Sequence, residues 1–328
     1  MITKETLQFM VTCERAIQSF FDSRGYLSCR VPVLSPKVIP ESTIPVFRTK
    51  LEDPDSPEKN QELYLLPSPE LYLKRLLADG IGNLYSLGPC FRNREFPSTK
   101  HRWEFTMLEF YTINASAQDS ISITLDLIQH LPRPSTSSPL FEPPEIMTMA
   151  EAWSKFGSLD LWAIADYPDT PEGNSQALQE ARNLLTSRGI SWQSEDTWDD
   201  CFQRLFIQFV EPEFPQDHPV IITDFPWRIP TTAKRQPLSP WAERWEMYLG
   251  QLELGNVYTE EDDPVAAETY LGHEIKQFQS MTHPPAWDQE YPRIAGSLPP
   301  CSGAAFGFER LVMAAGGYRS INQLLVSL

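Results

Sequence analysis

The chain has 328 residues, with 27 lysine and arginine against 44 aspartate and glutamate side chains, a formal net charge of −17. This excess of acid argues against a protein that binds nucleic acid over a broad basic face, because phosphate neutralisation needs clustered basic side chains. A hydrophobic content of 41% with 12% aromatic residues excludes a disordered chain. No apolar run approaches the ~18 residues of a membrane helix, so we expect no membrane association.

The cysteines and the distribution of charge further limit the kinds of protein that fit this sequence. Five cysteines, widely spaced and without a CxxC pair, argue against a disulfide framework or a zinc ribbon. The N-terminus lacks the apolar segment of a signal peptide, so we expect a cytoplasmic protein. Residues 141–230 hold sixteen acidic and five basic side chains, a net of −11. This concentration of acid predicts a separate module in the middle of the chain.

The first third of the chain predicts two helices and four strands. Apolar residues recur at helical spacing over 4–24, where Thr3 caps the start and Gly25 stops the helix. The first strand should end or lie at an edge at Pro32, because proline has no N–H. A second helix covers 69–79, and the strand-like runs are 26–34, 64–67, 84–91 and 105–113. The polar loop 51–61 is interpreted as a hairpin or a mobile insertion.

The rest of the chain mixes helices and strands without a regular rhythm. Residues 114–220 contain proline-rich loops and helical patches at 174–187 and 199–210. A strand begins at 220, and the segments that follow it are a strand pair over 241–260, a helix over 265–281 and a glycine-rich strand-to-helix unit over 301–317. Strands separated by helices and long loops, with no βαβ repeat, predict an α+β fold around an antiparallel sheet.

One chemically dense segment is the strand 105–113 with the charged loop before it. Successive side chains of a strand point to opposite faces, so Phe105, Glu109 and Tyr111 share a face. Arg92 returns to this strand through the hairpin. A carboxylate, a ring and a phenol beside an arginine can seat an ammonium ligand next to a phosphate. The alternative is an antiparallel hairpin with solvated charges.

A second dense segment is the glycine-rich run from Gly303 to Met313. Small residues let a strand approach a ligand closely, and Arg310 lies near the start of the following helix, where its guanidinium adds a bidentate fork for polyphosphate. Such strand-to-helix joins are common, so this signal is weak alone. The phosphate-binding patterns GxxxxGK[ST] and GxGxxG are both absent.

Acidic residues in the strand pair form a third group. Glu246, Glu253 and Glu260 are spaced by seven residues, which places neighbours on opposite strand faces unless a turn intervenes. Gly250 offers that turn. Two carboxylates beside a triphosphate would hold Mg²⁺, which prefers a few carboxylates plus phosphate oxygens. The alternative is a solvated acidic hairpin.

Together these segments resemble motifs 1, 2 and 3 of class II aminoacyl-tRNA synthetases, specifically the lysyl branch. Motif 1 is the helix ending at Gly25 and running on to Pro32, motif 2 is FRNRE…HRWEFTMLEFY, and motif 3 is GFERLVM. The resemblance covers residues 5–112 and 220–326. It implies a class II synthetase catalytic fold, an antiparallel sheet flanked by helices.

The layout resembles that of a stand-alone paralogue of those synthetases. A lysyl-tRNA synthetase carries an N-terminal anticodon-binding domain, whereas motif 1 here begins within the first ten residues. We therefore expect one catalytic domain over 1–328, with an acidic insertion of helices and loops at about 114–220 and no anticodon-binding domain. This layout, with Ser68 and Ala305, resembles the elongation factor P–(R)-β-lysine ligase family. Departures include Arg94 in place of an acid, Trp103 in place of proline, and Lys234, which is closer to the tRNA synthetases.

The resemblance implies ATP-dependent activation of a lysine-like amino acid, with Mg²⁺ as cofactor. Arg92 and Arg310 would be the catalytic residues, and Glu246 and Glu253 would hold the metal. ATP would contact Arg92, Asn93, Glu95, His101, Phe105, Glu246, Glu253 and Arg310. The amino acid would contact Ser68, Glu70, Glu109, Tyr111, Asn256, Tyr258, Glu260 and Ala305.

The resemblance also implies partners. The acceptor would be a lysine side chain of translation elongation factor P, with no stable tRNA binding, and the protein would be a homodimer. Two alternatives stay open at this point. One is a truncated synthetase that acylates tRNA or another acceptor with α-lysine, and the other is a non-catalytic synthetase-like regulator.

Overall fold

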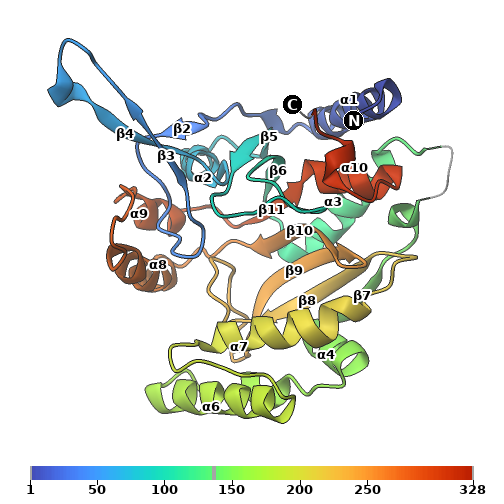
Figure 1. Ribbon diagram of the computed structural model, residues 1–328, viewed down its shortest axis with the longest axis vertical. Coiled ribbons are helices and arrows are strands. Elements are labelled where there is room, and N and C mark those ends of the chain that lie inside the picture. The colour runs from blue at the N-terminus through green and yellow to red at the C-terminus, as the bar shows by residue number, and fades with distance from the viewer. Residues whose placement is uncertain (1, 135–137, 327–328) are drawn as a thin grey trace. The chain divides into compact units, whose positions relative to one another are not determined.

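The computed structural model describes residues 2–134 and 138–326. The chain forms two compact units, one built from Met1–Ser138 and Glu260–Leu328 and the other from Pro139–Thr259. We refer to them as unit 1 and unit 2 and describe each by itself (Figure 1). Within the described residues, no helix is both long and apolar enough to cross a membrane.

Unit 1 is built on strands that hydrogen-bond in the order β1-β5-β6-β11. The pairs β5–β6 and β6–β11 are antiparallel, and β1 runs parallel to β5. The bounds are β1 (Leu27–Ser28), β5 (Leu84–Phe91), β6 (Glu104–Ile113) and β11 (Cys301–Gly307). The two long predicted strands and the glycine-rich strand are therefore confirmed, and they lie side by side.

The helices of unit 1 surround these strands. They are α1 (Lys4–Ser23), α2 (Glu70–Ala78), α3 (Ala117–His130), α8 (Pro264–Gln279), α9 (Tyr291–Ala295) and α10 (Phe308–Gly316). The predicted cap of α1 is confirmed, because the Thr3 hydroxyl accepts from the Thr6 N–H at 3.1 Å. Gly25 stops the helix with a φ of +75°, a conformation that side chains disfavour. Phe21 of α1 stacks on Tyr85 of β5, with ring centroids 4.9 Å apart.

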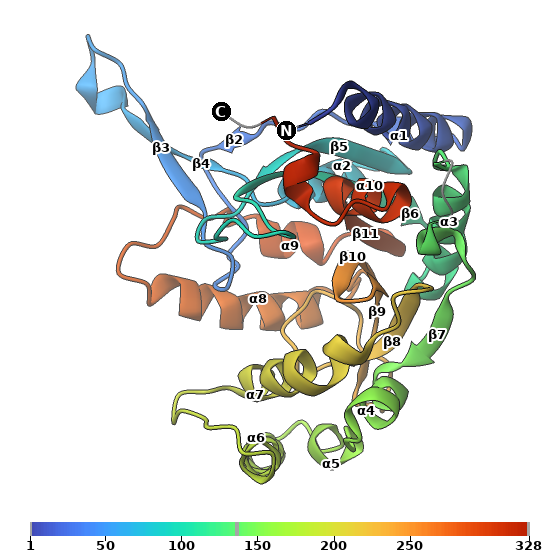
Figure 2. The same cartoon turned by 45° about the vertical axis from the view of Figure 1, so that its right-hand side comes forward.

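The predicted strand over 26–34 is wrong. Only Leu27–Ser28 and Leu34–Ser35 (β2) are extended and paired, and they belong to different sheets. β1 pairs with β5, whereas β2 pairs with β4 (Gln61–Leu65), which in turn pairs with β3 (Phe47–Leu51). The chain crosses from one sheet to the other around Pro32, where the missing N–H interrupts a ladder. The predicted hairpin around 51–61 is confirmed, with the short helix η1 (Pro57–Lys59) at its tip, and it projects from unit 1 in both ribbon views (Figures 1 and 2).

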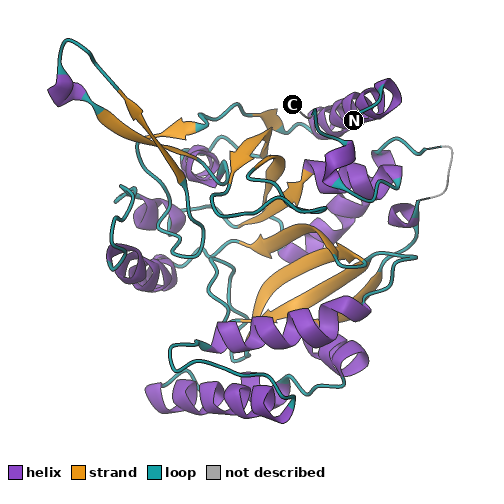
Figure 3. Ribbon diagram, viewed as in Figure 1, coloured by secondary structure: helices purple, strands orange, loops and turns teal. Residues whose placement is uncertain are grey.

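Unit 2 contains strands in the order β10-β9-β8-β7. Their bounds are β7 (Glu145–Thr148), β8 (Val220–Pro226), β9 (Trp241–Leu249) and β10 (Leu252–Thr259), with β7 and β8 parallel and the other pairs antiparallel. The helices α4 (Met149–Gly157), α5 (Trp162–Ala165), α6 (Pro171–Ser187) and α7 (Trp198–Leu205) gather on one side of these strands (Figure 3). Their core contains Trp153 stacked on Phe202, with ring centroids 5.1 Å apart.

Candidate active site

Three glutamates and one lysine meet in the interior of unit 1. We call Glu70, Glu109, Glu260 and Lys74 the carboxylate cluster. The Lys74 side chain is 0% exposed, and its Nζ lies 2.6 Å from Oε1 of Glu70 and 2.8 Å from Oε2 of Glu260. Glu260 is 1% exposed, and its Oε1 accepts no hydrogen bond from the described residues. The cluster therefore contains more acceptor oxygens than its one ammonium group satisfies.

The Glu109 carboxylate is held from both sides. Its Oε2 accepts from the Ser68 hydroxyl at 2.7 Å and its Oε1 from the Tyr111 hydroxyl at 2.8 Å. Ser68 also accepts from the Glu70 N–H at 3.0 Å, at the first turn of α2. The Glu109–Tyr111 bond confirms that these two side chains share a face of β6. The arrangement fixes Glu109 in one orientation toward the cluster.

Strand β11 brings small residues against this face. In the β6–β11 register, Ala305 lies opposite Glu109 and Gly303 lies opposite Tyr111. A Cβ atom on Gly303 would come within 2.2 Å of Oε1 of Glu260 and 2.8 Å of a Tyr111 ring carbon. Gly303 is thus required by the close approach of the strand to the cluster, and Ala305 adds one methyl group beside Glu109.

Burial shifts the acidity of the cluster. Burial, followed by the nearby Glu70 carboxylate, raises the pKa of Glu109 to about 8. Burial also raises the pKa of Glu260 to about 7, although the Lys74 ammonium opposes this shift. Desolvation disfavours a charged carboxylate, and a like charge adds to the effect. Both shifts favour the protonated form of these carboxylates in the ligand-free cluster, and a cationic ligand would favour the charged form instead.

The predicted ATP-binding residues of unit 1 lie around the start of the motif 2 loop. The main-chain N–H of Arg92 donates to the Trp103 carbonyl at 2.9 Å, so the hairpin returns as expected. The Arg92 guanidinium lies 5.3 Å from the centre of the Phe105 ring and 3.8 Å from Oε1 of Glu95. Its buried Nε donates to none of the described residues. An arginine with an unsatisfied buried donor fits an anionic ligand such as a phosphate.

Three further residues of unit 1 were predicted to bind ATP. The main-chain N–H of Asn93 donates to the Pro45 carbonyl at 2.9 Å, and Nδ1 of His101 lies 3.2 Å from the Ser98 hydroxyl. Arg310 is the third residue of α10, close to the helix start as expected, and its side chain folds back over Gly307. Each of these side chains is partly exposed.

The remaining predicted residues belong to unit 2. Gly250, with a φ of +54°, makes the predicted turn between β9 and β10. Asn256 lies opposite Glu246 and Glu253 opposite Tyr248, because the register shifts between Glu253 and Gly255. This bulge cancels the odd spacing along β10, so Glu246, Glu253 and Asn256 share one face. Tyr258 of β10 lies opposite Arg244 on the same face.

Glu246 already has protein partners. Its Oε1 accepts from the Arg244 guanidinium and its Oε2 from the Tyr248 hydroxyl. Burial, partly offset by Arg244 and reinforced by the charge of Glu253, raises the pKa of Glu246. Two nearby carboxylates that repel each other fit a hard cation such as Mg²⁺. However, no group of three or more histidine, cysteine, aspartate and glutamate side chains suited to a metal ion occurs among the described residues, so phosphate oxygens would have to complete the coordination.

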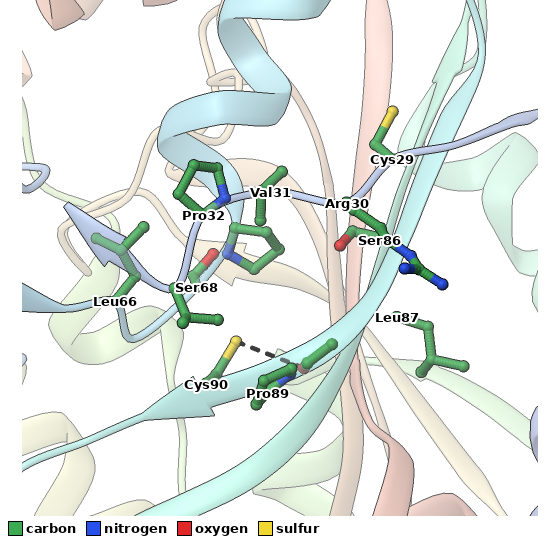
Figure 4. A pocket seen from close by; sticks show the side chains of 13 residues that line it. Cys29, Arg30, Val31, Pro32, Leu66, Ser68, Ser86, Leu87, Pro89 and Cys90 are labelled. Atoms are coloured by element: carbon green, nitrogen blue, oxygen red, sulfur yellow. Dashed lines mark hydrogen bonds between the residues drawn. The ribbon is translucent and has the colours of Figure 1, made fainter.

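A cavity of about 240 Å³ lies against strand β5, and Figure 4 shows the side chains that line it. The segment from Cys29 to Val33 and the strand β5 from Ser86 to Cys90 line it, and Ser68 lies at its border. Ser68 also donates to Glu109, so this side chain contacts both the cavity and the cluster. The cavity contains none of the cluster carboxylates in its lining.

Sequence reasoning missed several members of the site. Lys74 follows Glu70 by four residues, a helical spacing that predicts an ion pair, and this signal was available in the sequence. Tyr291, whose hydroxyl donates to Oε1 of Glu70 at 2.5 Å, lies more than two hundred residues away in sequence, and no local pattern indicates it. Arg244 and Tyr248, the partners of Glu246, alternate with it along β9 and were likewise detectable by strand periodicity.

Comparison with known proteins decides the family. The sequence family described as tRNA synthetases class II (D, K and N) matches residues 2–326. The chain belongs to this family. This confirms the predicted class II synthetase fold and the α+β class, and the relatives' names identify the chain as a ligase.

Individual relatives fall into two groups. The elongation factor P–(R)-β-lysine ligase of Vibrio cholerae is 29% identical over 323 residues, covering 97% of this chain and 93% of the relative. The ligase of the same name from Klebsiella pneumoniae is 31% identical over 317 residues, covering 94% and 90%. The lysine–tRNA ligase of Pelotomaculum thermopropionicum is 29% identical over 331 residues, which span 98% of this chain and 63% of the relative. The predicted resemblance to the lysyl-type paralogue is confirmed.

Proposed function

We propose that this ligase activates a lysine-like amino acid, (R)-β-lysine, with ATP and transfers it to a lysine side chain of elongation factor P. The observation that carries the proposal is the carboxylate cluster. A substrate with two ammonium groups needs several carboxylates, and Glu260 offers a buried oxygen without a donor. The near full-length similarity to ligases of that name supports the acceptor.

Activation needs no protein nucleophile. A carboxylate oxygen of the amino acid attacks the α-phosphorus of ATP, the bond to the β-phosphate oxygen breaks, and pyrophosphate leaves. Arg92 neutralises charge that builds on the α-phosphate, and Arg310 holds the far end of the triphosphate. Phe105 stacks on adenine, while Glu95 accepts from its amino group. Positioning and charge neutralisation supply the rate enhancement, as in other phosphoryl displacements.

Mg²⁺ would be held by Glu246 and Glu253, and it would neutralise charge on the triphosphate. Each Glu246 oxygen accepts one hydrogen bond, from Arg244 or Tyr248, and retains a second lone pair that could coordinate the metal. In the second step, Nζ of the acceptor lysine attacks the activated carbonyl carbon. The bond to the AMP oxygen breaks, AMP leaves, and the nitrogen loses a proton to give an amide.

The test is pyrophosphate exchange into ATP, followed by mass spectrometry of elongation factor P. We expect Arg92→Ala to lower exchange at least 100-fold with the fold retained, because the α-phosphate loses its guanidinium. Arg15→Ala, an exposed arginine on α1, is the matched control and should exchange normally. Normal exchange by Arg92→Ala would overturn the assignment.

A second candidate function is acylation of tRNA with α-lysine. The lysine–tRNA ligase similarity, at the same identity as that to the elongation factor P ligase, favours it. A tRNA charging assay run beside the elongation factor P assay separates the two. Label on tRNA alone would support this second function. The homodimer, the cytoplasmic location and the single catalytic domain with an insertion stay predictions.

A further inference from the structure

A side chain from helix α10 completes the hydrogen bonding at one end of strand β6. Strand β11 pairs with β6 only as far as Gly307, which lies opposite Met107. Thr106 lies one position beyond this last pair, so its N–H lies past the end of the ladder. The Glu309 carboxylate takes the place of a strand carbonyl there, because its Oε1 and Oε2 accept from the Thr106 N–H at 3.0 and 2.9 Å.

This hydrogen bond joins two buried groups in unit 1. Glu309 is 5% exposed and lies in the first turn of α10, which packs beside β6 (Figure 1). Burial raises the pKa of Glu309, and the hydrogen bond from Thr106 opposes that shift. A buried donor or acceptor that loses its partner costs free energy. The bond therefore holds the start of α10 against the start of β6.

Each partner in this bond is the chain neighbour of a residue that was predicted to bind ATP. Thr106 follows Phe105, whose ring centre lies 5.3 Å from the Arg92 guanidinium. Glu309 precedes Arg310 in the first turn of α10. Neighbouring Cα atoms are held about 3.8 Å apart by the peptide unit. The bond therefore links the main chain that carries the Phe105 ring to the main chain that carries the Arg310 guanidinium.

We propose that Glu309 is a positioning residue for ATP, which holds the main chain at Phe105 at a fixed separation from the main chain at Arg310. This inference rests on the proposed function, which gives Phe105 the adenine ring and Arg310 the far end of the triphosphate. One nucleotide contacts both residues only if their separation matches its length. A displacement of about 1 Å in such a site can cost on the order of 100-fold in rate.

The property that this role requires is hydrogen-bond acceptance rather than charge. Glu309 acts through the Thr106 main chain, and a neutral amide oxygen accepts the same bond as a carboxylate oxygen. Glu309→Gln therefore keeps the link, whereas Glu309→Ala removes it. Glu309→Asp withdraws the carboxylate by one methylene group and lengthens the link, which gives a milder variant if Glu309→Ala does not fold.

The test is calorimetric binding of ATP to the full-length variants, with β-lysine binding, pyrophosphate exchange and urea unfolding as further readouts. The matched control is Asn83→Ala. Oδ1 of Asn83 accepts from the Ile113 N–H at 2.8 Å, so it makes the same kind of bond at the opposite end of β6. A loss of stability alone should appear in both alanine variants, whereas a loss of positioning should appear only in Glu309→Ala.

We expect Glu309→Ala to weaken ATP binding by about tenfold or more and to raise the KM for ATP, because the two ends of the nucleotide no longer meet their partners together. Glu309→Asp should weaken ATP binding in the same direction by a smaller factor. The KM for β-lysine should change less than about threefold. Glu309→Gln and Asn83→Ala should both bind ATP within about threefold of the unmodified enzyme.

Three results would overturn the inference. They are unchanged ATP binding by both Glu309→Ala and Glu309→Asp, an equal loss of ATP binding in Asn83→Ala, and a failure of Glu309→Gln to keep ATP binding. An unmodified enzyme that binds ATP, with variants in the expected pattern, but that supports no exchange would refute the proposed function while leaving the Glu309 assignment standing. An enzyme that binds no ATP would refute both.

Discussion

Two buried glutamates, one in each unit, differ in how completely their carboxylate oxygens are hydrogen-bonded. Glu246 in unit 2 is 6% exposed and Glu260 in unit 1 is 1% exposed, and each lies beside a buried cation. Both oxygens of Glu246 accept hydrogen bonds from protein donors, whereas Oε1 of Glu260 accepts none from the described residues. Leaving a buried acceptor unpaired costs free energy. The fully paired carboxylate therefore stabilises the ligand-free fold, and the under-paired one gives up stability that the proposed ammonium ligand would restore.

The largest expected effect is a difference in the free energy of unfolding between the glutamine variants of Glu246 and Glu260. Glu246→Gln leaves the buried Arg244 guanidinium without its counter-charge, so we expect a loss of about 3 kcal/mol or more in the free energy of unfolding. Glu260→Gln should cost less than about 1.5 kcal/mol, because Lys74 keeps its ion pair with Glu70. Urea unfolding of both ligand-free variants measures the difference. Glu58→Gln, which changes an exposed glutamate of η1, is the control.

Equal losses in the two variants would break this comparison, since they would show that Glu260 stabilises the fold as much as Glu246 does. The two variants should also differ in how much the ligand raises their unfolding temperatures. Addition of β-lysine should raise the unfolding temperature of Glu246→Gln but leave that of Glu260→Gln nearly unchanged.

A second test uses pH. The pKa values of Glu109 and Glu260 are raised to about 8 and about 7 from 4.5, so the folded state binds more protons than the unfolded state between these values. The contribution of these two groups to stability is then fully present below about pH 4.5 and is lost as pH rises toward 8. We expect the ligand-free enzyme to lose more than about 1 kcal/mol between pH 5.5 and 8.

Urea unfolding at a series of pH values checks this slope. Glu109→Gln should flatten it, because the variant removes the group whose pKa lies highest. Saturating β-lysine should flatten it as well, since the bound ammonium groups stabilise the charged carboxylates. A stability that rises with pH in the ligand-free protein would contradict the account of an under-paired cluster.

The smallest expected effect concerns Ala305. Its methyl group lies opposite Glu109 in the β6–β11 register, at the wall of the cluster. Ala305→Gly should shift relative activation from β-lysine toward α-lysine by about tenfold, since a change of one methyl group is worth ~1–3 kcal/mol in a pocket. Pyrophosphate exchange with the two isomers measures the ratio. An unchanged ratio would show that the methyl group of Ala305 does not select between the two isomers.

Much of this site could be predicted from short-range patterns in the sequence. Strand periodicity places Glu109 and Tyr111 on one face, and Gly250 marks the turn that brings Glu253 opposite β9. These features depend on neighbours a few residues apart. The predicted strand over 26–34 is wrong because long-range pairing divides this segment. Its residues on either side of Pro32 belong to two different sheets.

Other features depend on contacts between distant segments. The bulge between Glu253 and Gly255 that aligns the acids of unit 2 has no clear signal in spacing alone. Tyr291 reaches Glu70, and Glu274 holds Ser42, across more than two hundred residues of sequence. Such pairs arise from tertiary packing, which periodicity and turn signals do not contain.

The close approach at Gly303 means that the floor of the carboxylate cluster is main chain. Strand β11 is hydrogen-bonded to β6, and its main chain cannot move aside by a rotamer change. The main chain would therefore limit how deeply a ligand can enter. The walls are side chains, and single substitutions can retune them. If the cluster binds the distal ammonium as proposed, side-chain substitutions could accommodate a new amine position, whereas a longer substrate would require strand β11 to move.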